Sequence, residues 1–321
     1  MKPLTRLRSG LSVLWEGSPV LTSAALLMTA ALAGSIAGLF FDSRLITGAP
    51  AWLKPAKFAV STAIYMFTLA WIFRQLPDWP RTRRIVGWVT AVILVLEVAI
   101  IDIQAWRGTT SHFNFTTPLD ATLFTIMGLA IVVQTLTSIA VAAALWRQQF
   151  DDAALGWALR LGMIITIIGA SAGGLMTRPT AAQLEEARTT GRMTIIGGHT
   201  VGAPDGGPGL PGTGWSVEHG DLRIAHFVGL HAMQVLPLLA LAIRRRRLPD
   251  AVRVRLVVVS AASYTALFLL VVWQALRGQP LVHPDGVSAI AFVVWAALTA
   301  GAGSIAIRRG GADVRRATVI A

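Results

Sequence analysis

Several ionisable side chains of this chain fall inside apolar segments, where such groups are rare. The run 221–243 carries His226 and His231 near its start, and the run 84–105 carries Glu97 and Asp102. Ionisable groups in a helix long enough to cross a membrane are costly, and they usually face a protein interior, a cavity or a cofactor. Imidazoles and carboxylates transfer protons and bind metal ions. These residue types in these positions therefore predict acid–base or metal chemistry.

The spacing of these residues predicts that acids and imidazoles lie at matching depths. With a rise of about 1.5 Å per residue, His226 lies roughly 7 Å and His231 roughly 15 Å from the start of their helix. On the run 84–105, Asp102 lies roughly 6 Å and Glu97 roughly 13 Å from the helix end on the same side. We therefore expect Asp102 near His226 and Glu97 near His231, in one site between two halves of the protein.

The five-residue spacing of the two histidines limits how they could share a metal ion. Residues at this spacing point about 140° from each other on a regular helix. His226 and His231 can bind one small ion only if the helix kinks or unwinds between them, and Gly229 lies where this could happen. The alternative is that His231 only hydrogen-bonds a neighbouring helix, while His226 and Asp102 are solvated at the membrane interface.

Other polar residues near the same helix ends complete the expected site. The residues expected to act in catalysis are Glu97, Asp102 and Lys57. Those expected to bind substrate are Lys54, Arg107, Arg223, Gln104 and Gln234, and those expected to bind metal are His226, His231 and His112. The basic side chains could instead extend to lipid head groups, and His112 could instead make only a loop hydrogen bond.

The composition predicts an integral membrane protein. Of the 321 residues, 54% are hydrophobic and only 14% are charged, with a mean hydropathy of +0.63, whereas about a quarter of the residues of a soluble domain are charged. Apolar runs long enough to cross a hydrocarbon core roughly 30 Å thick cover residues 19–41, 56–76, 84–105, 119–146, 155–176, 221–243, 253–276 and 286–307. No cysteine is present, which excludes disulfides and thiolate metal sites.

The basic residues are distributed unevenly between the two ends of these runs. With the N-terminus inside, 18 of the 28 Lys and Arg residues fall on the inner side, nine on the outer side and one, Arg160, within a span. This bias predicts that both termini are cytoplasmic and that the histidine-rich side of a cell-membrane protein is external. The formal charge of +12 is thereby explained without nucleic acid, and the expected partners are the lipid bilayer and a lipophilic or anionic small molecule.

Part of the sequence is repeated. Residues 53–58 align with 222–227 and residues 104–108 with 274–278, at offsets of 169 and 170. The nearly common offset predicts two four-helix repeats, residues 1–150 and 151–321. Because four spans is an even number, both repeats enter the membrane from the same side and are parallel. The fold class predicted is therefore an all-α membrane protein of eight transmembrane helices in two parallel repeats.

A long external segment, residues 177–220, separates the fifth and sixth expected spans. It is rich in Gly, Pro and Thr, and it contains Gly197–Pro211 followed by Trp215. Segments of this length in compact proteins are usually functional or disordered. We expect either a flexible linker or a lid on the outer face, and the apolar residues among the glycines favour the lid.

Two classes of function fit these residues. The first is a membrane enzyme or redox protein that depends on haem or on a transition metal such as Zn, Cu or Fe, since imidazole binds all of these. The second is a secondary transporter, in which Glu97 and the histidines bind protons or substrate. The polar residues crowd the outer halves of the spans, which favours the first. A non-catalytic receptor or accessory subunit is a third alternative.

Overall fold

The computed structural model describes the backbone of residues 3–246 and 248–320, and the side chains of residues 10–246 and 248–308. Within these ranges, seven helices are long and apolar enough to cross a membrane, and an eighth span results if the bent pair α8 and α9 is counted as one. The chain is thus an all-helical membrane protein, as its composition predicts. The helices are α1 (Pro3–Gly17), α2 (Pro19–Phe41), α3 (Leu53–Arg74), α4 (Pro80–Arg107), α5 (Pro118–Arg147), α6 (Ala153–Ala172), η1 (Gly173–Thr177), α7 (Ala181–Thr190), α8 (Leu222–Leu230), α9 (Ala232–Arg244), α10 (Asp250–Leu276) and α11 (Gly286–Ile320).

The chain divides into two compact units. Unit 1 comprises residues 1–144, 174–199 and 204–215, and unit 2 comprises residues 145–173, 200–203 and 216–321. Most of the long segment after α6 therefore belongs to the same unit as the first helices. This segment also has regular structure, because it forms α7 and the strand β3 (Thr200–Val201).

In unit 1, α2 packs against α3 and α4, and α3 also contacts α4 and α1. Glycines allow two of these close approaches. A Cβ atom at Gly17 would overlap the backbone carbonyl of Ala70, and one at Gly38 would overlap the indole ring of Trp52. The buried side chains of Leu21, Met66 and Phe73 fill this packing. The helix α1 was not expected from the apolar pattern, since its sequence is too polar to read as a span.

A hairpin joins α2 to α3. Its strands β1 (Leu45–Ile46) and β2 (Ala49–Pro50) are antiparallel, and the turn contains Thr47 and Gly48, both with positive φ, as two-residue hairpin turns require. Asp42 anchors the hairpin by accepting hydrogen bonds from Arg44 and from the Trp52 indole. The hydrogen bonds from Arg44 hold the pKa of the Asp42 carboxyl well below its usual range.

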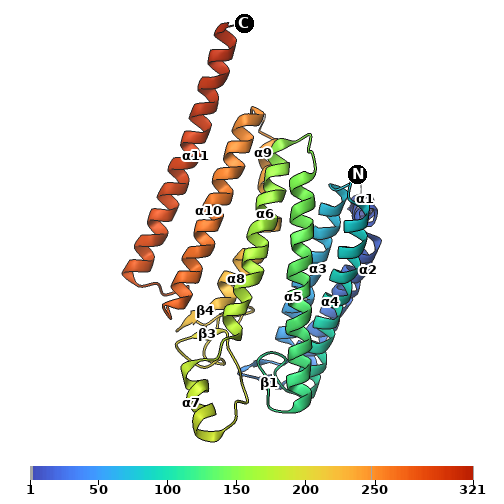
Figure 1. Ribbon diagram of the computed structural model, residues 1–321, viewed down its shortest axis with the longest axis vertical. Coiled ribbons are helices and arrows are strands. Elements are labelled where there is room, and N and C mark those ends of the chain that lie inside the picture. The colour runs from blue at the N-terminus through green and yellow to red at the C-terminus, as the bar shows by residue number, and fades with distance from the viewer. Residues whose placement is uncertain (1–2, 247, 321) are drawn as a thin grey trace. The chain divides into compact units, whose positions relative to one another are not determined.

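In unit 2, α6 packs against α8, α9 and α10, and α10 packs along α11 (Figure 1). Gly169 on α6 and Gly229 on α8 face each other so closely that a Cβ atom on either would overlap the other backbone. Gly229 is therefore needed for close helix packing, and the expected break in this span lies beyond it.

The break between α8 and α9 occurs at His231, where the two helices meet at 46°. Thr166 on α6 satisfies the backbone groups that the break releases, because its hydroxyl donates to Leu230 O (3.3 Å) and accepts from Met233 N–H (3.0 Å). Tyr264 on α10 donates its hydroxyl to Val228 O (2.5 Å). Side chains on neighbouring helices thus replace the missing helical hydrogen bonds, as broken membrane helices require.

We predict that Thr166→Val lowers the thermal stability of the protein in membranes or detergent, whereas Thr166→Ser does not. Valine has nearly the same shape but cannot replace the hydroxyl, so two buried backbone groups lose a partner, at a cost of about 1–3 kcal/mol for each group left unsatisfied. A thermal-unfolding measurement on both variants checks this. Equal melting temperatures for the Val and Ser variants would show that the hydroxyl does not hold the break.

Candidate functional site

The centre of the candidate site in unit 1 is Glu97 on α4. Its residue exposure is only 4%. One carboxylate oxygen, Oε1, lies 3.6 Å from His112 Nε2, and the other, Oε2, is buried without a hydrogen-bond partner in the described part of the chain. Lys54 on α3 lies close enough for its positive charge to attract this carboxylate. A buried carboxylate with an imidazole and an ammonium group nearby is suited to exchanging a proton.

His112 lies on the loop between α4 and α5, and this loop fixes the orientation of its ring. The ring Nδ1 is hydrogen-bonded to Ser111 Oγ (3.1 Å), so that Nε2 faces Glu97. Asn114 organises the loop, since its amide donates to Thr109 Oγ1 and Thr110 O and its carbonyl accepts from Thr116 N–H. The sequence predicts that His112 is either a ligand or a loop hydrogen-bonding residue. Its contact with Glu97 is an additional finding of the structure.

Three phenylalanines surround the His112 imidazole. The ring centroids of Phe58, Phe113 and Phe124 lie 5.5, 6.0 and 6.0 Å from that of His112. Phe58 also packs against the buried cluster of Ile100, Ile101 and Met127. The polar pair is therefore enclosed by aromatic side chains. In such apolar surroundings, interactions between charges are stronger than in water.

A second imidazole–carboxylate pair lies beside the first, also in unit 1. His199 Nδ1 donates to Asp205 Oδ2 (2.6 Å), and the His199 backbone N–H donates to the same carboxylate. The His199 ring packs edge-on against Phe113, with centroids 4.9 Å apart. The sequence pattern did not pair His199 with Asp205, because residues six apart in a Gly/Pro-rich loop have no fixed geometry.

The residues expected to bind an anionic substrate are mostly engaged in local networks. Arg107 donates to Asp120 Oδ1 (2.6 Å) and Gln104 Oε1 (2.5 Å), and Gln104 Nε2 also donates to Asp120 Oδ1 (2.8 Å). Arg223 forms an ion pair with the buried Asp221 (2.5 Å). Lys57, which the sequence predicts to be catalytic, donates to the backbone carbonyl of Thr213 (2.7 Å). These bonds stabilise helix ends and loops, and Lys54 is the basic residue that acts on Glu97.

The two expected site histidines of unit 2 lie on either side of the Gly169–Gly229 contact. His226 donates from Nδ1 to Gly169 O (2.8 Å), which fixes its tautomer. His231 lies at the break, where its ring packs on Phe227 at 4.2 Å and its side chain interacts with Gln234. Their expected partners, Asp102 and Glu97, belong to unit 1, so the pairings across the units stay predictions. Asp102 Oδ1 is buried and has no hydrogen-bond partner in the described ranges.

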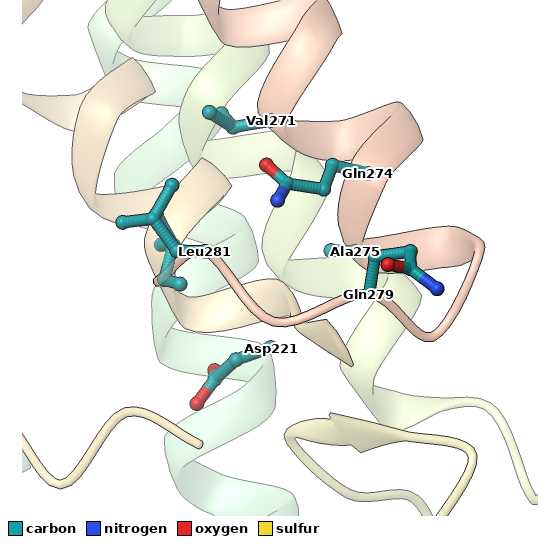
Figure 2. Close-up of a pocket in the computed structure, with 7 residues that line it drawn as sticks. Asp221, Val271, Gln274, Ala275, Gln279 and Leu281 are labelled. Carbon is teal, nitrogen blue, oxygen red and sulfur yellow. The ribbon is translucent and has the colours of Figure 1, made fainter. Parts of the chain in front are cut away.

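A small pocket in unit 2 is lined by residues of the strand β4 (Gly220–Asp221), of α8, of α10 and of the turn after α10 (Figure 2). Asp221 and Gln274 are its main polar residues. Asp221 accepts from Arg223 and from Ser216 N–H, and the Gln274 amide, which points toward the turn in Figure 2, donates to Pro280 O (2.8 Å). Asp221 is thus engaged by residues near the start of α8 and Gln274 by the turn after α10, so both polar groups serve the local structure of the helix ends.

Among the residues whose placement is described, no group of three or more His, Cys, Asp or Glu side chains could hold a metal ion. The pairs Glu97–His112 and His199–Asp205 each bring together two such side chains. The metal-binding role expected of His112, His226 and His231 therefore stays a prediction.

Comparisons with protein-family models, with curated protein sequences and with solved structures gave no match for this chain. Its function is therefore inferred from the chemistry of its own residues.

Proposed function

We propose that this chain is a multi-pass membrane enzyme or redox protein in which Glu97 and His112 carry out acid–base chemistry. The observation that supports this most strongly is the placement of the Glu97 carboxylate, with one oxygen 3.6 Å from His112 Nε2 and the other buried without a hydrogen-bond partner among the residues that the structure describes. A carboxylate buried inside a membrane-length helix is explained by protonation, pairing or function.

In this proposal each residue has a distinct role. Glu97 takes or gives a proton at its carboxylate, and His112, exposed to a greater extent than Glu97, relays that proton to the loop side through its second ring nitrogen. Lys54 attracts a negatively charged group of the substrate. The surrounding phenylalanines exclude water and favour a substrate with a lipophilic part.

A haem or a transition metal bound by histidine is part of the proposal. His226 supports it, because an imidazole whose Nδ1–H is held by a backbone carbonyl, as by Gly169, has the tautomer common in metal ligands. When bound, such a group would supply redox or Lewis-acid chemistry.

We predict a haem absorption band or stoichiometric metal in protein purified without chelator, diminished in His226→Ala. Visible absorption spectroscopy and metal analysis of both proteins check this. Colourless, metal-free protein would contradict the cofactor part of the proposal and leave the acid–base part standing.

We propose that the architecture is an internal duplication with parallel repeats 1–150 and 151–321. Both termini are cytoplasmic in this proposal, and the histidine-rich side is external to the cell membrane. Corresponding helix ends support the repeat. Gln104 and Gln274 each donate to the carbonyl six residues ahead, and Gly108 and Gly278 both have positive φ. The three-helix packing of α2, α3 and α4 is also matched by that of α6, α8–α9 and α10.

The alternative function is a proton-coupled secondary transporter. The broken span at His231 favours it, because substrate and ion sites of transporters are often formed at discontinuous helices. In this alternative, Glu97 binds the coupling proton. A proton-driven flux of substrate across sealed vesicles, absent in Glu97→Gln, would separate transport from catalysis.

We predict that Glu97 reacts with a lipid-soluble carbodiimide, which modifies protonated carboxyl groups in membranes, and that the reaction slows as the pH rises. Mass spectrometry of peptides from labelled membranes measures this. Glu97→Gln provides the background, and Glu185 on the exposed face of α7 serves as an aqueous comparison. Absence of Glu97 labelling at every pH would indicate a permanently ionised, structural carboxylate and contradict the proposal.

A further inference from the structure

Phe113 has a backbone conformation that its side chain does not favour. Its φ is +62°, which is uncommon for a non-glycine residue and unfavourable for a bulky one. Strained backbone of this kind persists only where the surrounding structure enforces it, and it is concentrated at functional sites. In this conformation the Phe113 ring is 6% exposed and contacts both His112 and His199 edge-on. It therefore lies between the two imidazole–carboxylate pairs.

A segment after α7, residues 194–199, is fastened to the loop that carries His112. Phe115 N–H donates to Thr194 O (2.8 Å), Ile196 N–H donates to Phe113 O (3.0 Å), and Asn114 forms an isolated antiparallel bridge with Ile195. We call residues 194–199 the cover segment. Its pairing with the loop is short and has two backbone hydrogen bonds.

The other end of the cover segment is held by α7 and η1. Gln183 of α7 binds both backbone groups of Gly197, accepting its N–H (2.9 Å) and donating to its carbonyl (2.8 Å). Gly198 N–H donates to Met176 O (2.9 Å). Gly197 has φ +98°, and a Cβ atom there would overlap Met176 O and press on the Phe113 ring. The segment is thus held against Phe113 by specific contacts along its length.

His199 ends the cover segment, and Asp205 holds its ring. The bond from Nδ1 to the carboxylate (2.6 Å) and the two contacts of the backbone N–H with the same carboxylate fix the imidazole against Phe113. The contacts therefore run from the Glu97–His112 pair to Phe113, from Phe113 to His199, and from His199 to Asp205.

We infer that the cover segment is a gate over the Glu97–His112 pair, and that Phe113 is its latch. This inference rests on the proposed function, since a gate is useful only where Glu97 exchanges protons or binds a ligand. Closed, the latch holds His112 toward Glu97 and keeps water-soluble molecules from the carboxylate. Open, it admits an aqueous proton carrier to Glu97 from the loop side. Phe113 and His199 are positioning residues in this account.

Locking the gate is the most direct test. The sequence has no cysteine, so Asn114→Cys with Ile195→Cys introduces a single possible pair. The hydrogen bonds on both sides make these two a non-hydrogen-bonded antiparallel pair, with a Cα separation of about 4.5 Å, which a disulfide can span. The rate at which a water-soluble carbodiimide labels Glu97 is measured in oxidised and reduced forms of this same double variant, so the loss of the Asn114 side-chain hydrogen bonds is common to both. We expect labelling to be about tenfold slower when oxidised, the change that about 1.4 kcal/mol in the opening free energy produces.

Removing the Phe113 ring is expected to have the opposite effect on the labelling rate of Glu97. Phe113→Gly removes the ring but suits the positive φ, so the loop keeps its conformation while labelling by the water-soluble reagent becomes faster. Phe115→Ala is the matched control, because Phe115 lies in the same loop and packs on Phe124. Thermal unfolding confirms that each variant is folded.

The outcomes separate the gate from the proposed function. The gate and the proposed function are both supported by two results together. The lipid-soluble carbodiimide labels Glu97 equally in all variants, and the water-soluble reagent labels it more slowly in the oxidised cysteine pair and faster in Phe113→Gly. The gate alone is overturned if the water-soluble reagent labels Glu97 at the same rate in oxidised protein, in reduced protein and in Phe113→Gly. Absence of labelling by either reagent in every variant overturns the proposed function and the gate with it.

Discussion

The need to partner a carboxylate inside a membrane-length helix governs the arrangement of unit 1. Glu97 is almost fully buried on α4, and an unpaired charge in such a place is strongly unfavourable. His112 is brought to 3.6 Å from it by a loop that Asn114 organises. Phenylalanines then enclose the imidazole, and a segment distant in sequence pairs with the loop from the other side. The strained backbone at Phe113 is one consequence of fitting these parts together.

The same requirement, that polar groups away from water have partners, explains the main irregularities of unit 2. The span that breaks at His231 keeps its backbone groups satisfied because Thr166 and Tyr264 reach them from neighbouring helices. Close packing of Gly169 on Gly229 brings α6 near enough for Thr166 to do so. At the helix ends, arginines bind acids of the following turns, as Arg277 binds Asp285 (2.6 Å). Hydrogen bonds from Arg277 and Ser288 hold the pKa of Asp285 at about 2.

Much of the helical architecture could be predicted from hydropathy, because spans are long and apolar and each has a separate run in the sequence. The spacing of His226 and His231 predicts a kink near Gly229 only if both histidines bind one ion, and the structure has a break at His231 itself. The helix α1 was missed because its composition is mixed. Glu97 could be identified from its position alone, since a carboxylate in an apolar run is rare.

The rest of the site could not be predicted because it depends on loop geometry. His112 faces Glu97 only through the fold of the loop between α4 and α5, and the pairing of 113–115 with 194–196 joins segments with no repeating pattern. Gly197 and Gly198 lie in the stretch that the sequence predicts to be a flexible linker or a lid, but its composition does not indicate which loop it contacts. The ion pairs of Arg107 with Asp120 and of Arg223 with Asp221 also depend on local turn geometry that the sequence pattern does not show, and the substrate-binding role of both arginines stays a prediction.

The central claim is that Glu97 exchanges a proton with His112 within the folded protein. Infrared difference spectroscopy of the reconstituted protein across a pH step tests this most directly, because a protonated carboxyl group has its own carbonyl-stretching band. The account predicts such a band in the wild-type protein, its loss in Glu97→Gln and a changed pH profile in His112→Gln. A spectrum with no Glu97-dependent band at any pH, or one unaffected by His112→Gln, would contradict it.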